Sequence, residues 1–102
     1  MDLASRAGYN GARRVPPLDT HEIERRIEES IPGASARVEG GEAHFSARVV
    51  SSAFEGKTPV ERHLMIYALF QKEMADQAIH ALALRTATPS EWERETGTKE
   101  VR

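Results

Sequence analysis

The sequence predicts a single α+β domain in which helices cover one face of a three-stranded mixed sheet. Three observations predict it: an amphipathic helical pattern precedes Pro32-Gly33, two alternating segments flank Gly40-Gly41, and a further alternating segment at 79–86 follows a long helical pattern. The expected order is helix, two-strand hairpin, helix, strand and short helix. A chain of 102 residues supports one modest core and leaves no room for a second independent domain.

The first helix is expected to begin after Asp19 and to end at Pro32-Gly33. Asp19 can cap its first turn, and Glu22 lies at its third position. Its apolar face repeats every four residues as Ile23, Ile27 and Ile31. Residues 1–17 show no apolar period, so we expect a disordered N-terminal tail there, followed by a folded domain at 18–95.

A β-hairpin is expected next, with Gly40-Gly41 as a two-residue turn, because such turns need positive φ. Counting outward opposes Arg37 to His44 and Glu39 to Glu42. The repulsion between the two glutamates leaves a looser four-residue loop as the alternative. One face then carries Ala36, Val38, Ala43, Phe45, Ala47 and Val49. The other face carries Arg37, His44, Ser46 and Arg48.

A longer helix should start at Thr58-Pro59 with a hydroxyl cap and run to about Ala75. Its broad apolar stripe comprises Val60, Leu64, Met65, Tyr67, Ala68, Leu69 and Phe70. The following strand, 79–86, should lie parallel to strand 44–51, because a helical crossover usually joins neighbouring parallel strands. A last short helix begins after Thr88. We expect Trp92 to pack this helix onto the core, the chain to fray from Glu93 onward, and residues 96–102 to form a frayed tail.

Composition and charge narrow the classes of function. The net charge of −2 gives no overall attraction to nucleic acid or membranes. Because cysteine is absent, metal chemistry would depend on histidine and carboxylates. No apolar run reaches the ~18 residues of a membrane span and no signal peptide is evident, so we expect a soluble, cytoplasmic protein. No nucleophile, carboxylate pair or glycine-rich loop has a recognisable catalytic arrangement, so we do not expect an enzyme.

Three segments stand in a characteristic order and spacing. They are Phe45 to Ser51 continuing into Ser52-Ala53-Phe54-Glu55-Gly56-Lys57, Val60-Glu61-Arg62-His63 with Tyr67, and Ile79-His80-Ala81-Leu82 with Thr88-Pro89 and Trp92. Together they resemble the BolA family over about residues 19 to 95. The resemblance implies a fold similar to the class II K-homology (KH) domain.

The same resemblance implies a function. Members of this family pair with a monothiol glutaredoxin and share a [2Fe-2S] cluster, to which the glutaredoxin and glutathione supply thiolates. The histidine corresponding to His80 is then a cluster ligand, together with a second histidine or cysteine from the hairpin loop. The implied role is an accessory one in iron-sulfur cluster assembly, trafficking or iron sensing.

The second ligand is open at this point. The hairpin loop, Glu39 to Ala43, contains neither histidine nor cysteine, so His44 is the nearest candidate and His63 the next. Strand counting argues against His44, because it falls on the outward face whereas His80 shares parity with the inward Leu82. His80 can still reach the rim if the pleat does not hold at the first turn of the strand.

Nucleic-acid binding is the competing function, and some members of the family are known as transcriptional regulators. Five residues are candidates for phosphate contacts: Lys57, Arg62, His63, Arg48 and Arg85. Against this, a KH site clamps RNA with a Gly-x-x-Gly loop, and the matching turn here, Phe54 to Lys57, has one glycine and an acid. The isolated chain is expected to be a monomer or a weak dimer.

Overall fold

The structure, a computed structural model, describes residues 18–97. Its elements are α1 (Thr20–Ser30), β2 (Ser35–Gly41), β3 (His44–Val50), the 3₁₀ turn η2 (Ser52–Phe54), α2 (Pro59–Tyr67), the 3₁₀ turn η3 (Ala68–Phe70), α3 (Gln71–Ala75), β4 (Ala81–Ala87) and α4 (Pro89–Thr96). The sheet order is β2-β3-β4, with β2 antiparallel and β4 parallel to β3. This confirms the α+β fold with a three-stranded mixed sheet. The tail expected at 1–17 lies outside the described residues, as does all of the tail expected at 96–102 except Thr96 and Gly97.

Helix starts follow from side-chain capping, as the sequence predicts. The Asp19 carboxylate accepts from the Glu22 amide at 2.8 Å. Thr58 and Thr88 each form a complete capping box with the glutamate three residues later. Helix ends were harder to predict. The long second helix is divided into α2, η3 and α3, and α4 continues to Thr96 with Gly97 as its left-handed cap instead of fraying from Glu93.

The hairpin turn lies two residues later than the sequence suggested. Gly41 pairs with His44, so the turn is Glu42-Ala43, with φ of 53° and 71°. Gly40 is instead part of β2, where φ is +124° and a β-carbon would come within 2.2 Å of the His44 carbonyl oxygen. The glycines therefore provide close backbone approach and not the turn itself. Each pairing partner moves by four residues, an even number, so the expected faces are unchanged.

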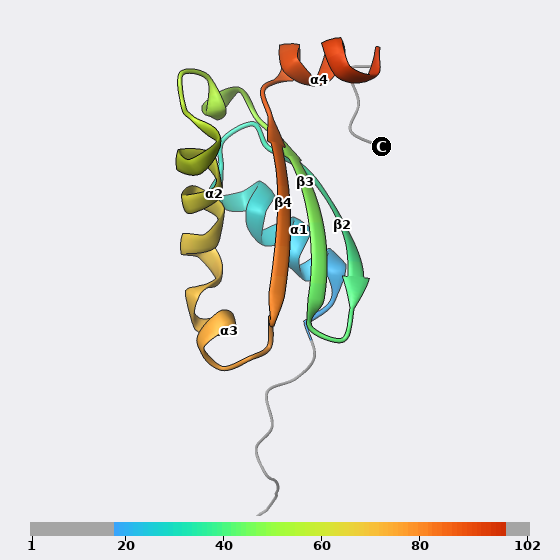
Figure 1. Cartoon of the computed structure of the whole chain (residues 1–102), viewed down its shortest axis with the longest axis vertical. Helices are drawn as coiled ribbons and strands as arrows, with labels where there is room; N and C mark the ends of the chain where they lie inside the picture. Colours follow the sequence, from blue (N-terminus) through green and yellow to red (C-terminus); the bar gives the residue numbers. More distant parts are fainter. Residues whose placement is uncertain (1–17, 98–102) are drawn as a thin grey trace, which may run out of the picture.

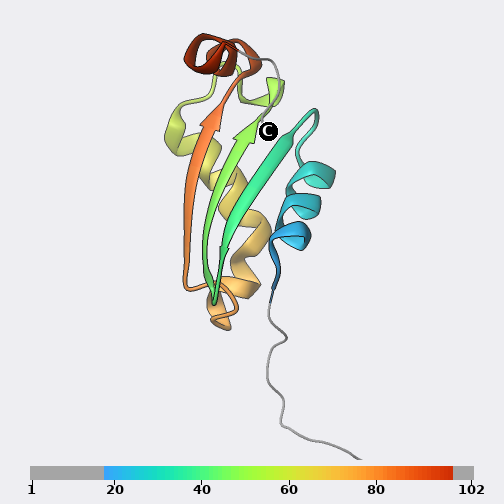
Figure 2. The same ribbon diagram turned by 90° about the vertical axis from the view of Figure 1, so that its right-hand side faces the viewer.

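The main core lies between the sheet and the helices α1, α2 and α3, which cover the same face (Figures 1 and 2). Its buried members include Ile23, Ile27, Ile31, Val38, Phe45, Val49, Phe54, Ile66, Phe70, Ile79 and Leu82. The expected stripe on α2 is only partly buried, because Val60 and Leu64 are 67% and 60% exposed. These two residues face solvent on the far side of the helix.

Trp92 is buried, but away from the main core. It forms a second cluster with Val50 and Ala87, which are register partners and share parity with the outward residues of β3 and β4. The expectation that α4 packs onto the main core is therefore wrong in detail: α4 closes the end of the opposite face of the sheet. The remainder of that face, here called the open face, is exposed or half-exposed at Arg37, Glu39, His44, Ser46, Arg48, Ala81, Ala83 and Arg85.

Candidate metal centre

His44 and His80 come together at one end of the sheet. His44 is the first residue of β3, and His80 immediately precedes β4, so the two stand at the end of the sheet that holds the β2–β3 turn (Figure 1). Their ring centres lie 5.6 Å apart, with the ring planes at 85°. Both residues are exposed. The structure thus pairs the sequence-predicted ligand with its first-ranked partner.

The backbone of the hairpin turn holds this arrangement. The Ala43 carbonyl accepts from the amides of His80 at 2.7 Å and Ala81 at 3.1 Å. On the other side of His80, Ile79 is 1% exposed and donates its amide to the Glu73 carbonyl at 3.0 Å. His80 is therefore fixed between a buried anchor and a paired strand. Sequence reasoning missed the role of Ala43, because it placed the turn at the glycines.

The inward orientation suggested for His80 by strand parity is wrong. β4 begins at Ala81, so His80 lies before the pleat and its side chain is not bound by the alternation that buries Leu82. His44 faces outward, as expected. The structure shows His80 at the rim of the sheet, which was the alternative to an inward orientation.

The hydrogen bond of His44 fixes which nitrogen can bind a metal. Its Nδ1 lies 3.0 Å from the Glu42 carbonyl oxygen. A carbonyl only accepts, so Nδ1 carries the proton and Nε2 presents a lone pair. Metal-binding histidines commonly use a backbone carbonyl in this way to set the tautomer. Within residues 18–97, Nε2 of His44 and the ring nitrogens of His80 make no hydrogen bond that would compete with a metal.

The spacing of the two rings fits ligation of one metal ion. A metal–nitrogen bond of about 2.1 Å puts an imidazole centre about 3.2 Å from the ion, so two rings in tetrahedral positions lie about 5.2 Å apart. The observed separation of 5.6 Å is close to this value. In the described part of the chain, no group of three or more histidines or carboxylates is placed to hold an ion. His44 and His80 are therefore two candidate ligands, and a metal site here would need further ligands from outside these residues.

His63 lies at the other end of the sheet. It is in the second turn of α2, next to Arg62, whose guanidinium bonds Glu91 of α4 at 2.8 Å. The seven-residue strand β4 separates this end from His80 by about 20 Å. The structure does not bring His63 to the histidine pair.

The residues predicted for nucleic-acid binding are also divided. Arg62 is 7% exposed and donates to the Lys57 carbonyl at 2.9 Å as well as to Glu91. It joins α2 to α4 and is not available to a phosphate. Arg48 and Arg85 lie on the open face, away from Lys57 and His63, which belong to the α2 side. The five candidates therefore do not form one surface.

The ion pair with Arg62 strongly lowers the pKa of Glu91. Hydrogen bonds from Arg62, and then from the Thr88 amide, lower the pKa of Glu91 from its ordinary 4.5 to about 2. Glu91 is therefore ionised throughout the physiological range. This pair stabilises the contact between α2 and α4.

Comparison with known proteins decides the family. The model of the BolA-like protein family matches residues 20–91. The chain belongs to the BolA-like family. BolA-like protein 1 of Pongo abelii is 45% identical over 95 residues, covering 83% of this chain and 68% of that protein. The DNA-binding transcriptional regulator BolA of Haemophilus influenzae is 42% identical over 59 residues, covering 58% of this chain and 56% of that protein.

Solved BolA structures share the fold. A BolA homologue from Coxiella burnetii superposes with a TM-score of 0.67 at 38% identity, over 76% of this chain and 99% of that one. The BolA domain of SufE1 from Arabidopsis thaliana gives a TM-score of 0.63 at 36% identity, over 71% of this chain and 93% of that one. No helix among residues 18–97 is long and apolar enough to span a membrane. The more specific KH-like description stays a prediction.

Proposed function

We propose that this chain is an accessory protein of iron-sulfur cluster assembly, trafficking or iron sensing that forms a complex with a monothiol glutaredoxin. The two proteins and glutathione share a [2Fe-2S] cluster, with Nε2 of His44 and a ring nitrogen of His80 on one iron. The observation that carries the proposal is the proximity of these two exposed imidazoles, whose ring centres lie 5.6 Å apart. The BolA domain present in a SufE-like protein is consistent with a role related to iron-sulfur proteins.

The donor set suits this cluster. Two neutral imidazoles on one iron give Rieske-type ligation, which raises the reduction potential above that of an all-thiolate cluster. The chain has no cysteine, so thiolates for the second iron must come from the partner and glutathione. What this chain contributes is orientation: the Glu42 carbonyl fixes the His44 tautomer, and the Ala43 carbonyl holds the backbone at His80.

The test combines the purified chain with a monothiol glutaredoxin, glutathione, iron and sulfide under anaerobic conditions. Visible absorption and circular dichroism then report the cluster. We expect a spectrum distinct from that of the glutaredoxin homodimer, lost in His80→Ala and His44→Ala and kept in the matched control His63→Ala. A cluster that assembles equally well in both of the first two variants contradicts the proposal. Loss in His80→Ala and His63→Ala alone would assign the second ligand to His63.

DNA binding is the second candidate, favoured by the name of the Haemophilus influenzae relative. Arg48 and Arg85 are the two candidate cations that lie together, as register partners on the open face. A contribution of these arginines to DNA binding would appear as a shallower salt dependence of the affinity for duplex DNA in Arg85→Gln than in the wild type. An unchanged slope contradicts it.

A further inference from the structure

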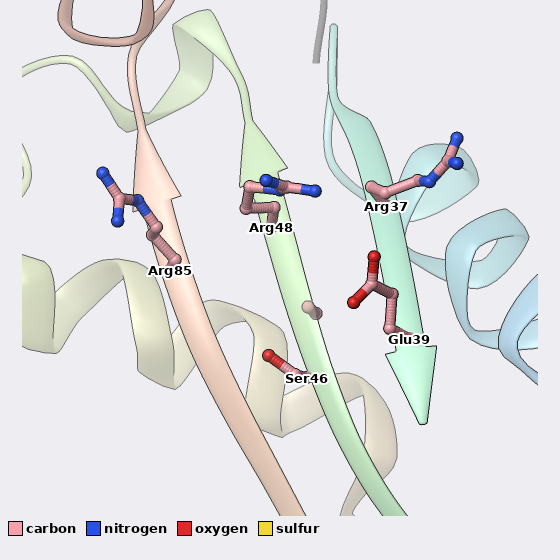
Figure 3. A pocket seen from close by; sticks show the side chains of 6 residues that line it. Arg37, Glu39, Ser46, Arg48 and Arg85 are labelled. Carbon is pink, nitrogen blue, oxygen red and sulfur yellow. The ribbon is translucent and has the colours of Figure 1, made fainter. Parts of the chain in front are cut away.

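Three arginines form a row across the open face. Arg37 is the register partner of Arg48 in the antiparallel pair, and Arg48 is the partner of Arg85 in the parallel pair. Neighbouring strands lie about 4.8 Å apart, so the row spans about 10 Å. Like charges directly opposite one another destabilise a sheet. Figure 3 shows the consequence: the side chains of Arg37 and Arg85 diverge, and that of Arg48 reaches from β3 toward β2.

Charges within the chain neutralise this row only in part. Arg85 forms an ion pair with Glu95 of α4, and the guanidinium carbon of Arg48 lies 5.7 Å from the centre of the Trp92 ring. Arg37 makes no ion pair or hydrogen bond with its side chain within residues 18–97. Glu39 lines the same shallow hollow of about 270 Å³, but forms no ion pair with the arginines. Among the described residues, three cations thus face two carboxylates, Glu39 and Glu95, and only Glu95 is paired.

The arginine row is continuous with the histidine pair. His44 and Arg48 lie on β3 with the same outward parity, four residues or about 13 Å apart. On β3 and β4 the strip between them carries small side chains: His44 is opposite Ala81, and Ser46 is opposite Ala83. On β2, Ser46 is opposite Glu39. A flat strip of small residues allows another protein surface to approach closely. A macromolecule that supplies further ligands to a metal held by the histidine pair would therefore lie next to this strip.

We propose that the thiolate-bearing partner covers the open face from the histidine pair to the arginine row, and sets a patch of carboxylates against the three arginines. This rests on the proposed function. It places the acidic patch of the partner over Arg48 and its neighbours, about 13 Å along β3 from His44. Charge complementarity of this kind chiefly steers encounter and fixes orientation.

The open face favours protein carboxylates over nucleic-acid phosphates. Arg85 already binds a carboxylate of the chain. Glu39 lines the same hollow and would repel phosphates and carboxylates alike, so the acidic side chains of the partner must lie over the arginines and away from Glu39. Trp92 is the one aromatic side chain that packs on this face in the described structure, and it is buried and not available to stack on a base.

The decisive variant is Arg37→Glu, because Arg37 has no ion pair or hydrogen bond to lose within the described residues and the fold should be unaffected. The matched control is Lys57→Glu in the turn before α2, an exposed cation with a similar change of charge on the helix-covered side, whose side chain also makes no ion pair or hydrogen bond within residues 18–97. The affinity of each variant for a monothiol glutaredoxin loaded with glutathione and a [2Fe-2S] cluster is measured at 50 and 300 mM salt. We expect Arg37→Glu to weaken binding about tenfold at low salt and less at high salt. The circular dichroism of the shared cluster should be unchanged.

The outcomes separate this proposal from the proposed function. Equal affinities of the wild type and Arg37→Glu at 50 mM salt overturn the docking surface, whereas an intact cluster spectrum in the same samples leaves the histidine assignment standing. An Arg37→Glu chain that loses affinity for duplex DNA and keeps its affinity for glutaredoxin also overturns it, and assigns the row to nucleic acid. If changing one acidic residue of the glutaredoxin to a basic one restores the binding of Arg37→Glu, that result establishes the contact. A wild-type chain that forms no complex overturns both proposals.

Discussion

Polar side chains are buried and paired at one end of the sheet and exposed at the other. At the α4 end, Arg62 is buried and donates to the Lys57 carbonyl and to Glu91, which also accepts from the Thr88 amide. At the hairpin end, hydrogen bonds to the backbone hold His44 and His80 in place, but both side chains are exposed, and within residues 18–97 the only ring-nitrogen hydrogen bond of the pair is that of His44 Nδ1. The difference shows that residue type alone does not indicate function. A basic residue that is buried and paired within the fold stabilises the fold, whereas an oriented imidazole with a free lone pair is available to a partner.

The largest effect on stability should come from the hairpin end, with Gly40→Ala. The new β-carbon would lie 2.2 Å from the His44 carbonyl oxygen, at a φ of +124°. We expect a loss of about 3 kcal/mol in the free energy of unfolding, because both the clash and the backbone strain must be relieved. Urea denaturation measures it. Gly41→Ala is the control, since its β-carbon meets no atom within 4 Å and should cost less than about 1 kcal/mol. Equal costs for the two variants would contradict the register described here.

At the other end, Arg62→Ala should be nearly as damaging. It leaves the Glu91 carboxylate without its bidentate partner and removes the contact of the guanidinium with the Phe54 ring. Since Glu91 is 35% exposed, we expect a loss of about 2 kcal/mol, below the value for a fully buried pair. Arg25→Ala removes two exposed ion pairs on α1, with Glu22 and Glu29, and should cost about 0.5 kcal/mol or less. A similar small cost for Arg62→Ala would show that the α2–α4 contact does not stabilise the fold.

The same pair predicts a pH dependence of stability. The folded-state pKa of Glu91 is lowered to about 2 from 4.5, so its contribution is fully present above pH 5 and is lost as the pH falls toward 2. The full shift corresponds to about 3 kcal/mol, and screening at a carboxylate that is a third exposed reduces this to about 1 kcal/mol. Urea denaturation at pH 7 and pH 3 should therefore show a smaller loss in Glu91→Gln than in the wild type. An identical loss would exclude Glu91 as a source of acid sensitivity.

The sequence predicted the elements well because their signals are local. Capping residues such as Asp19, Thr58 and Thr88 mark helix starts, and alternation along 44–50 identifies the inward face. The errors arise where the role of a residue depends on a contact with another part of the chain. Position 40 needs a glycine because a β-carbon there would clash with the carbonyl oxygen of His44. Turn statistics cannot reveal this contact. Arg62 is buried by Glu91, which lies 29 residues further along.

The candidate site was predictable in its members but not in its geometry. His80 and His44 were ranked first and second, yet strand parity suggested that they faced opposite sides. Whether they bind a cluster stays a prediction. The row containing Arg37 was missed, because its three members become neighbours only when the shifted hairpin register and the parallel pairing of β3 and β4 are both known.

The smallest predicted effect sharpens the contrast between the two ends by addressing the hairpin turn alone. Ala43 has φ of 71°, a conformation that costs an alanine more than a glycine. Ala43→Gly relieves this strain but adds backbone entropy to the unfolded chain, so we expect a net gain of about 0.5 kcal/mol. The Ala43 carbonyl is retained, so His80 should stay in place and the spectrum of the glutaredoxin complex should be unchanged. Destabilisation by this variant would mean that the turn does not lie at Glu42-Ala43. Stabilisation with a lost spectrum would show that the strained turn is needed to orient the histidine pair.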